Sequence, residues 1–236
     1  RGPNGIASRV AAQHSQDYSA WYSHIPGLKV LSPYDANDAS GLLRAAIRDE
    51  NPVIFLEHRW LHNIVDDVPI EGYTVPIGEA RVAREGKDIT IVSHSYMVLE
   101  SIRCANAMEQ HGIDVEVIDL RSIRPLDTNT ILNSIRKTRR LVVVDNGWIT
   151  YGVSAEIIAL ATENLFEQMI CPPIRIGMND SPSPSTRALA NDYYPRSIDI
   201  AKELISIFNL GLNEESIIPE SKTPLDIPDP TFKGPF

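Results

Sequence analysis

Short runs of β-branched and aliphatic residues alternate along the chain with longer stretches in which apolar residues recur at helical spacing. The apolar runs predict strands over 28–32, 52–57, 89–94, 114–120, 140–145 and 172–178. The longer stretches predict helices over 35–50, 96–112, 127–139, 153–168 and 198–208. Asp127 is placed to cap one of these helices, and Gly112 to end another. Because such alternation is typical of parallel strands joined by crossover helices, we predict an α/β fold with a mainly parallel sheet.

The same pattern divides the chain into two units and a tail. Residues 58–75 break the alternation with proline, glycine and charged residues, so we interpret them as a linker that ends a first unit over 1–75. Residues 76–210 form a second unit that could fold alone, with 78–92 as an added edge ribbon. Residues 211–236 are rich in proline and predict an extended tail. Its apolar residues leave packing and disorder both open: Leu225, Ile227, Phe232 and Phe236.

Composition narrows the class of protein. The 236 residues are 43% hydrophobic and carry a formal net charge of -9, which argues against a nucleic-acid surface. The basic run Arg136 to Arg140 is explained by a solvated helix end. Cys104 and Cys171 show neither disulfide nor zinc spacing, which favours a reducing compartment. Without a membrane-length apolar run or a signal peptide, we expect a cytoplasmic protein, or a matrix protein if the source is eukaryotic.

Several motifs that would identify a chemistry are missing from the sequence. It contains no GxGxxG or GxxxxGK[ST] phosphate-binding loop and no GxSxG nucleophile elbow. His58 and His62 have the spacing of two zinc ligands on a helix, but the segment lacks the HExxH glutamate and follows a strand, which disfavours a metal site. For the lone histidines at element ends we favour structural roles: His24, His94 and His111.

Two segments at strand ends allow both a binding and a structural reading. In "DLRSIRPLD", Arg121 and Arg124 could meet a ligand at the carboxyl end of a parallel strand, but we favour pairing with Asp119 or Asp127 across an interface. In "DNGWITYGVSAEI", free amides at a helix start could meet an anion. Trp148 and Tyr151 in that loop more readily suggest a subunit contact.

The segment "AAQHSQ", next to the turn "GPNG", is the best candidate for chemistry. An imidazole can donate to or accept from a reacting oxygen near neutral pH, and the turn places His14 at the edge of a helix. On residue type alone, a structural histidine remains the favoured reading.

Taken in order, "RGPNG", "AAQHSQDYSAWYSHIPGLKVLSP", "LLRAAIRDENPVIFLEH", "DITIVSHSYMV", "DLRSIRPLD" and "DNGWITYGVSAEI" resemble the β subunit of the thiamine-diphosphate-dependent 2-oxoacid dehydrogenase E1 component, in the transketolase superfamily. The resemblance runs from residue 1 to about residue 208. It implies the C-terminal part of a pyrimidine-binding domain followed by a transketolase C-terminal-type domain. The front of the first domain, with the glutamate that activates the aminopyrimidine ring, would lie upstream of residue 1.

The resemblance also implies site residues, cofactors and partners. His14 matches the family's active-site histidine, so the resemblance favours a catalytic role over the structural role that residue type alone suggested. Gln13 and Ser15 would support His14. A potassium ion in some relatives is held by backbone carbonyls at positions matching Ala46, Ile47, Asp49 and Asn51. Thiamine diphosphate would be shared with an α-type subunit that holds magnesium, in a heterotetramer with a second β-like chain and a possible E2 acyltransferase.

The resemblance implies oxidative decarboxylation of pyruvate or a related 2-oxoacid, with the chain active only beside its α-type partner. Departures from the family pattern are the long tail and the segment "SPSPSTRALANDYYP". They keep two alternatives open, a non-catalytic dimerisation or assembly module and a transketolase-like transferase subunit of a biosynthetic pathway.

Overall fold

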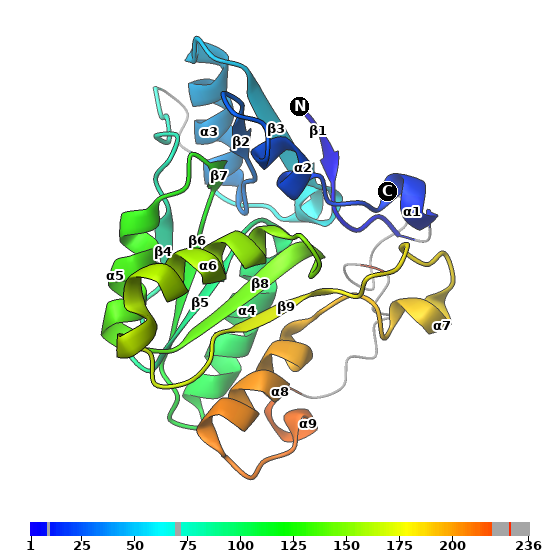
Figure 1. The fold of residues 1–236 in the computed structure, drawn as a ribbon. Helices are drawn as coiled ribbons and strands as arrows, with labels where there is room; N and C mark the ends of the chain where they lie inside the picture. The colour runs from blue at the N-terminus through cyan, green and yellow to red at the C-terminus, as the bar shows by residue number, and fades with distance from the viewer. Residues whose placement is uncertain (9, 69–71, 219–226, 228–236) are drawn as a thin grey trace.

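The computed structural model describes residues 1–8, 10–68, 72–218 and 227, and it contains two sheets (Figure 1). The first is four-stranded, in the order β1 (Gly2–Asn4), β3 (Val53–His58), β2 (Lys29–Leu31), β7 (Ser122–Arg124). β1, β3 and β2 are parallel, and β7 pairs antiparallel with β2. We call the elements from β1 to residue 68 the N-terminal unit and those from β4 onward the C-terminal unit, so β7 is a strand of the second unit that completes the sheet of the first.

The second sheet is five-stranded, in the order β4 (Arg81–Arg84), β6 (Val115–Asp119), β5 (Ile89–Ser93), β8 (Leu141–Trp148), β9 (Ile174–Met178). Its strands are parallel except β4, which pairs antiparallel with β6 at the edge and confirms the predicted edge ribbon. Every residue of β5 and β6 is buried, as expected for central strands covered on both faces. The α/β fold with a mainly parallel sheet is therefore confirmed.

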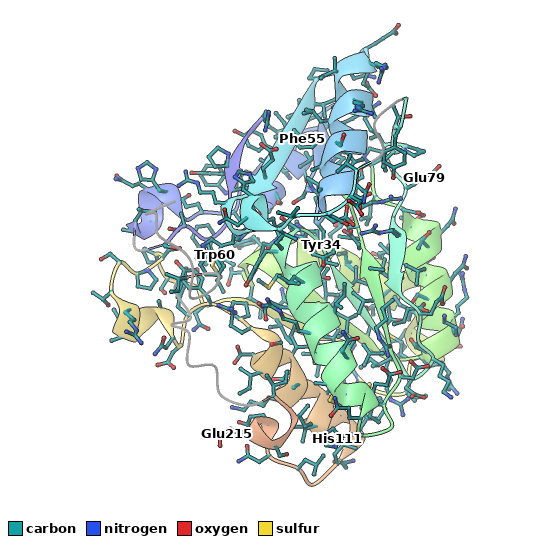
Figure 2. The ribbon with its side chains drawn as sticks, turned by 180° about the vertical axis from the view of Figure 1, so that it is seen from behind. Tyr34, Phe55, Trp60, Glu79, His111 and Glu215 are labelled. Carbon is teal, nitrogen blue, oxygen red and sulfur yellow. The ribbon has the colours of Figure 1, made fainter. Side chains whose placement is uncertain are left out.

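The long helices confirm the helical spacing read from the sequence. They are α3 (Ala36–Arg48), α4 (Tyr96–Glu109), α5 (Thr128–Thr138), α6 (Val153–Leu165) and α8 (Ser197–Phe208). α5 and α6 lie on one face of the second sheet, and α4 and α8 on the other (Figures 1 and 2). The predicted cap is present, because the Asp127 side chain accepts the Thr130 N–H at 3.0 Å. Gly112 follows α4 with a φ of +79°, which suits a glycine at a helix end.

The shorter elements are α1 (Ala11–His14), α2 (Ser19–Ser23), the 3-10 helices η1 (Arg59–Asn63) and η2 (Phe166–Gln168), α7 (Arg187–Ala190) and α9 (Glu214–Ile217). Of these, the one that ends at His14 and the one over 166–168 lie where a helix was predicted, and the others were not predicted. The predicted linker begins with η1, whose Trp60 is only 1% exposed and joins the core shared with α4 and α8. Figure 2 shows Trp60 at the level where the two units meet. This segment therefore packs between the units rather than only connecting them.

The cores of the two units differ in size. A small cluster of Leu31, Leu42, Phe55 and Val75 serves the first sheet, whereas two larger clusters fill the faces of the second sheet. Of the predicted tail, α9 packs through Ile217, and Leu225, Phe232 and Phe236 lie outside the described residues. None of the helices within the described part of the chain combines the length and apolar composition that crossing a membrane requires.

Candidate active site

His14 lies on a loop that leaves the carboxyl end of β1 and returns to α2. The two ends of this loop are fastened by three hydrogen bonds. Gly5 N donates to Gln16 O at 2.8 Å, Asn4 Nδ2 donates to Asp17 Oδ2 at 2.6 Å, and Tyr18 N donates to Asn4 Oδ1 at 2.7 Å. We call the residues that make these bonds the neck: Asn4, Gly5, Gln16, Asp17 and Tyr18. A loop with its ends held together in this way presents its tip in a defined position.

Gly5 explains why the turn "GPNG" has its sequence. Its φ is +74°, and a Cβ at this position would lie 2.4 Å from His58 Cδ2. Both the backbone conformation and the close approach of the His58 ring therefore require glycine at the first residue after β1.

The three residues singled out in "AAQHSQ" have different environments. Gln13 and His14 are exposed at the end of α1, whereas Ser15 is fully buried. The Ser15 hydroxyl donates to Ala7 O at 3.0 Å, so it braces the loop from inside. This places the imidazole of His14 where a bound molecule could reach it, with Ser15 as an internal support.

His94 lies beneath the neck, and it is not the isolated residue that the sequence suggested. It follows β5 and is fully buried, with Nδ1 3.2 Å from Ser32 Oγ, Asn146 Nδ2 donating to its carbonyl, and Nε2 3.5 Å from Asp145 Oδ1. Burial alone would lower the pKa of His94, but the carboxyls of Asp145 and Asp17 raise it above its usual range.

The two carboxyl groups around His94 respond differently to burial. Burial opposes ionisation of Asp145, but its contact with His94 and the N–H groups of Ser154 and Gly147 lower its pKa. Burial raises the pKa of Asp17, against the opposing field of His94. We call Asp17, His94 and Asp145 the neck cluster. The sequence shows only that His94 and Asp145 end predicted strands, and the structure shows that these strands are neighbours.

His58 is a structural residue rather than a metal ligand. Its Nδ1 accepts the Trp60 N–H at 3.2 Å, its ring stacks on Tyr96 with centroids 4.9 Å apart, and burial lowers its pKa to about 3. His62 is exposed, and within the described residues no group of three or more His, Cys, Asp or Glu side chains is arranged to hold a metal. His24 and His111 are exposed at the ends of α2 and α4.

The arginines of "DLRSIRPLD" bind the two units together. Arg121 Nη1 donates to Asp38 Oδ1 at 3.1 Å, and Arg124 donates to the carbonyl of Ser23. The predicted structural role at an interface is therefore confirmed for these arginines, but the carboxylate that pairs with the Arg121 side chain is Asp38 rather than Asp119 or Asp127. Asp119 instead accepts the backbone N–H of Arg121.

In the loop "DNGWITYGVSAEI", the carboxylate of Asp145 occupies the start of the following helix. Asp145 Oδ2 accepts the Ser154 N–H at the start of α6 at 2.8 Å, which fills the place where an external anion was considered. Trp148 Nε1 lies 2.9 Å from Ser181 O and 2.8 Å from Tyr193 Oη, whereas Tyr151 is 93% exposed. The Trp148 side chain is thus engaged within the chain, and Tyr151 is the residue of this loop that is accessible for the suggested subunit contact.

The segment proposed for potassium lies at the end of α3. The Asp49 carboxylate pairs with Lys29 Nζ and accepts both N–H groups of Asn51, and the Lys29 contact lowers its pKa to about 2. Asp49 N donates to Ala46 O at 3.3 Å, and Ile47 is 75% exposed. The Ala46 carbonyl is thus engaged, and a site built from carbonyls of this segment remains a prediction.

Comparisons with known proteins agree with this architecture. Residues 78–200 match the family described as transketolase, C-terminal domain, and residues 1–63 match transketolase, pyrimidine binding domain. The chain therefore belongs to the transketolase superfamily, whose domains of this type indicate dependence on thiamine diphosphate.

Within that superfamily, the chain is similar to β subunits of the pyruvate dehydrogenase E1 component. It is 50% identical over 212 residues to the mitochondrial pyruvate dehydrogenase E1 component subunit beta of Drosophila melanogaster, covering 88% of this chain and 58% of the relative. It is 48% identical over 200 residues to the corresponding subunit of Rickettsia felis, covering 85% of this chain and 61% of the relative. The chain thus spans about three fifths of the length of these relatives.

A solved structure shows the same fold. A chain described as "Split gene transketolase, inactive beta4 tetramer" superposes with a TM-score of 0.70 at 24% identity, over 84% of this chain and 63% of that one.

Proposed function

We propose that this chain is the β-type subunit of a thiamine-diphosphate-dependent 2-oxoacid dehydrogenase, and that His14 acts directly on its substrate. The observation that carries the proposal is the position of His14, exposed on a fastened loop at the carboxyl end of a parallel strand. Ligands of open α/β sheets bind at such strand ends. The relatives named pyruvate dehydrogenase E1 component subunit beta support the reaction class.

The proposed division of work follows from the side chains present. When bound, thiamine diphosphate supplies the electron sink for loss of carbon dioxide from a 2-oxoacid. The accessible imidazole of His14 donates a hydrogen bond or proton to the substrate oxygen as negative charge develops there. Gln13, exposed next to it, is available for a polar contact, while Ser15 keeps the loop in shape.

The partners and metal ions are part of the same proposal. An α-type subunit holds the magnesium ion and the diphosphate of the cofactor. A second β-like chain, an E2 acyltransferase that receives the acyl group and a potassium ion at the end of α3 complete the assembly. We propose a cytoplasmic or mitochondrial matrix location, supported by the mitochondrial relatives.

Replacement of His14 tests the proposal. In the full-length chain assembled with its α-type partner, we expect His14→Gln to slow acyl transfer from a 2-oxoacid about 100-fold or more, which is the usual size of a general acid–base contribution. Because His14 is exposed, the melting temperature should stay unchanged.

The matched control is His111→Gln, since His111 is also exposed but lies at the far end of α4 (Figure 2). It should retain the full rate. Equal rates for the two variants would contradict a catalytic His14 and favour a non-catalytic assembly module.

A further inference from the structure

The loop that carries His14 meets the C-terminal unit at several points, among them Ile6, which packs in the core shared with α4 and α8, and the buried carboxyl group of Asp17. Asp17 lies at the neck, is 5% exposed, and uses both of its oxygens within the N-terminal unit. Oδ2 accepts from Asn4 Nδ2 at 2.6 Å, and Oδ1 accepts from Ser19 N at 2.8 Å. Asp17 therefore joins the end of β1, the end of the loop and the start of α2.

The opposite side of Asp17 faces the C-terminal unit. A Cβ built on Gly147 would lie 3.5 Å from Asp17 Cβ and also 3.5 Å from Asp145 Oδ1, so the two carboxyl-bearing side chains flank the same glycine of β8. Both distances are those of ordinary van der Waals contact, so Asp17 and Asp145 pack closely on this part of β8. The loop thus rests directly on the carboxyl end of the second sheet.

Electrostatics also acts at this contact. Burial opposes ionisation of the Asp17 carboxyl group, and the buried imidazole of His94, whose Nε2 lies 3.5 Å from Asp145 Oδ1, acts in the opposite direction on the pKa of Asp17. The carboxyl group of Asp119 in β6 also raises the pKa of His94, and His94 lowers the pKa of His58 in β3.

A second contact lies on the other side of His14. Ser183 Oγ donates to the carbonyl of Ser15 at 3.5 Å and approaches Tyr193 Oη at the same distance. Tyr193 in turn donates to Ser181 O at 2.6 Å. The segment "SPSPST" of the C-terminal unit therefore supports the loop beside the residue that follows His14.

From this geometry we propose that Asp17 is a positioning residue that fixes the His14 loop on the C-terminal unit. The proposal rests on the proposed function, because it assigns to Asp17 the placement of the His14 imidazole. It predicts that loss of the Asp17 carboxylate releases the loop without removing any group that touches substrate.

Asp17→Asn is the first test, since an amide has a single acceptor oxygen for the two donors that Asp17 now satisfies. The first readout is hydrogen exchange of the full-length chain, measured without any cofactor. We expect amides over 5–18 to exchange at least tenfold faster. Asn4→Ala removes the side-chain donor to Asp17 together with the acceptor of the Tyr18 N–H, so it should give at least the same local change, and it serves if Asp17→Asn fails to fold.

The matched control is Asp38→Asn, because Asp38 is also buried and pairs across the two units, with Arg121 and Arg81. It should leave exchange over 5–18 unchanged. Exchange over 5–18 that is unaltered in a folded Asp17→Asn or Asn4→Ala variant, or altered equally by Asp38→Asn, would overturn the proposal.

The second readout separates positioning from general destabilisation. In the assembled enzyme, Asp17→Asn should lower kcat about tenfold to a hundredfold with little change in the KM of the 2-oxoacid, because misplacement of a reacting group acts on the chemical step. In a His14→Ala background the same substitution should have no further effect on kcat. An additive effect on kcat in the double variant would overturn the proposal that Asp17 acts by positioning His14. An unchanged rate in His14→Ala alone would overturn the proposed function. In that case the hydrogen-exchange result would still decide whether Asp17 attaches the loop.

Discussion

At the scale of single residues, Gly152 lies where the backbone closely approaches the carboxylate of Asp145. Gly152 lies at the start of α6, and a Cβ there would be 2.3 Å from Trp148 O and 2.6 Å from Asp145 Oδ2. Since Asp145 belongs to the neck cluster, the small size of Gly152 is part of what lets that carboxylate reach the N–H of Ser154.

Gly152→Ala should therefore destabilise the chain. Overpacking at a site bounded by backbone and a buried carboxylate costs about 1–3 kcal/mol, and we expect a loss in this range in chemical denaturation. Gly2→Ala is the control, because a Cβ at Gly2 has nothing within 4 Å. Similar free energies of unfolding for the two variants would show that the space at Gly152 is not limiting.

Within the candidate site, His14 was predicted from the sequence and the neck cluster was not. His14 was found because it follows a glycine turn and matches a family motif. The neck cluster was missed, because its members are far apart in sequence and become neighbours only when β5 pairs with β8 and the loop folds onto both. Sequence periodicity locates each strand, but it carries no direct information on which strands are adjacent.

At the scale of elements, predictions succeeded where the local pattern is strong. The long helices have clear spacing and end signals such as Asp127 and Gly112, and the parallel strands are continuous apolar runs. Most of the short elements were not predicted because they contain only a few residues, and isolated short helices gain little from propensity alone. Their stability comes from tertiary contacts, such as Trp60 of η1 packing against Tyr96.

β7 is the element that departs most from the sequence-based division of the chain. It follows β6 closely, yet it leaves the second sheet and pairs with β2 in the first. The pattern "SIR" shows nothing of this exchange, since a strand of three residues looks the same in either sheet. The exchange brings Arg121 to Asp38 and so builds part of the interface between the units.

At the scale of the whole molecule, a buried network of opposite charges holds the two units together. Arg81 contacts Asp35, Asp38 and Asp119, and Arg121 also contacts Asp38. Two guanidinium groups thus face three carboxyl groups. Burial, together with the neighbouring Asp38, raises the pKa of Asp119 to about 7 despite these arginines.

This network predicts a pH dependence with a defined sign. Because the pKa of Asp119 is raised on folding, its contribution to stability is complete below its unfolded value of about 3.8 and is lost as the pH rises through about 7. The raised pKa values of His94 and Asp17 act in the same direction. The lowered pKa of Asp145 matters only at acid pH, where protonation of that group removes its contribution.

His58, whose pKa is lowered to about 3, contributes with the opposite sign below about pH 6.5, and it does so equally in the wild-type chain and in Asp119→Asn. We therefore expect the melting temperature of the wild-type chain to fall relative to that of Asp119→Asn as the pH rises from 5 to 8. Thermal melts at several pH values in one ionic strength would measure both slopes. Parallel slopes would show that Asp119 does not bind its proton within this range.

The central claim is that His14 belongs to an active site that this chain forms only together with an α-type subunit. Calorimetric titration with thiamine diphosphate and magnesium tests it most directly, using the full-length chain alone, the α-type subunit alone and their mixture. We predict tight binding in the mixture and much weaker binding to either chain by itself, with His14→Gln still able to bind. Equally tight binding to the full-length chain alone, or no binding in the mixture, would contradict a shared site.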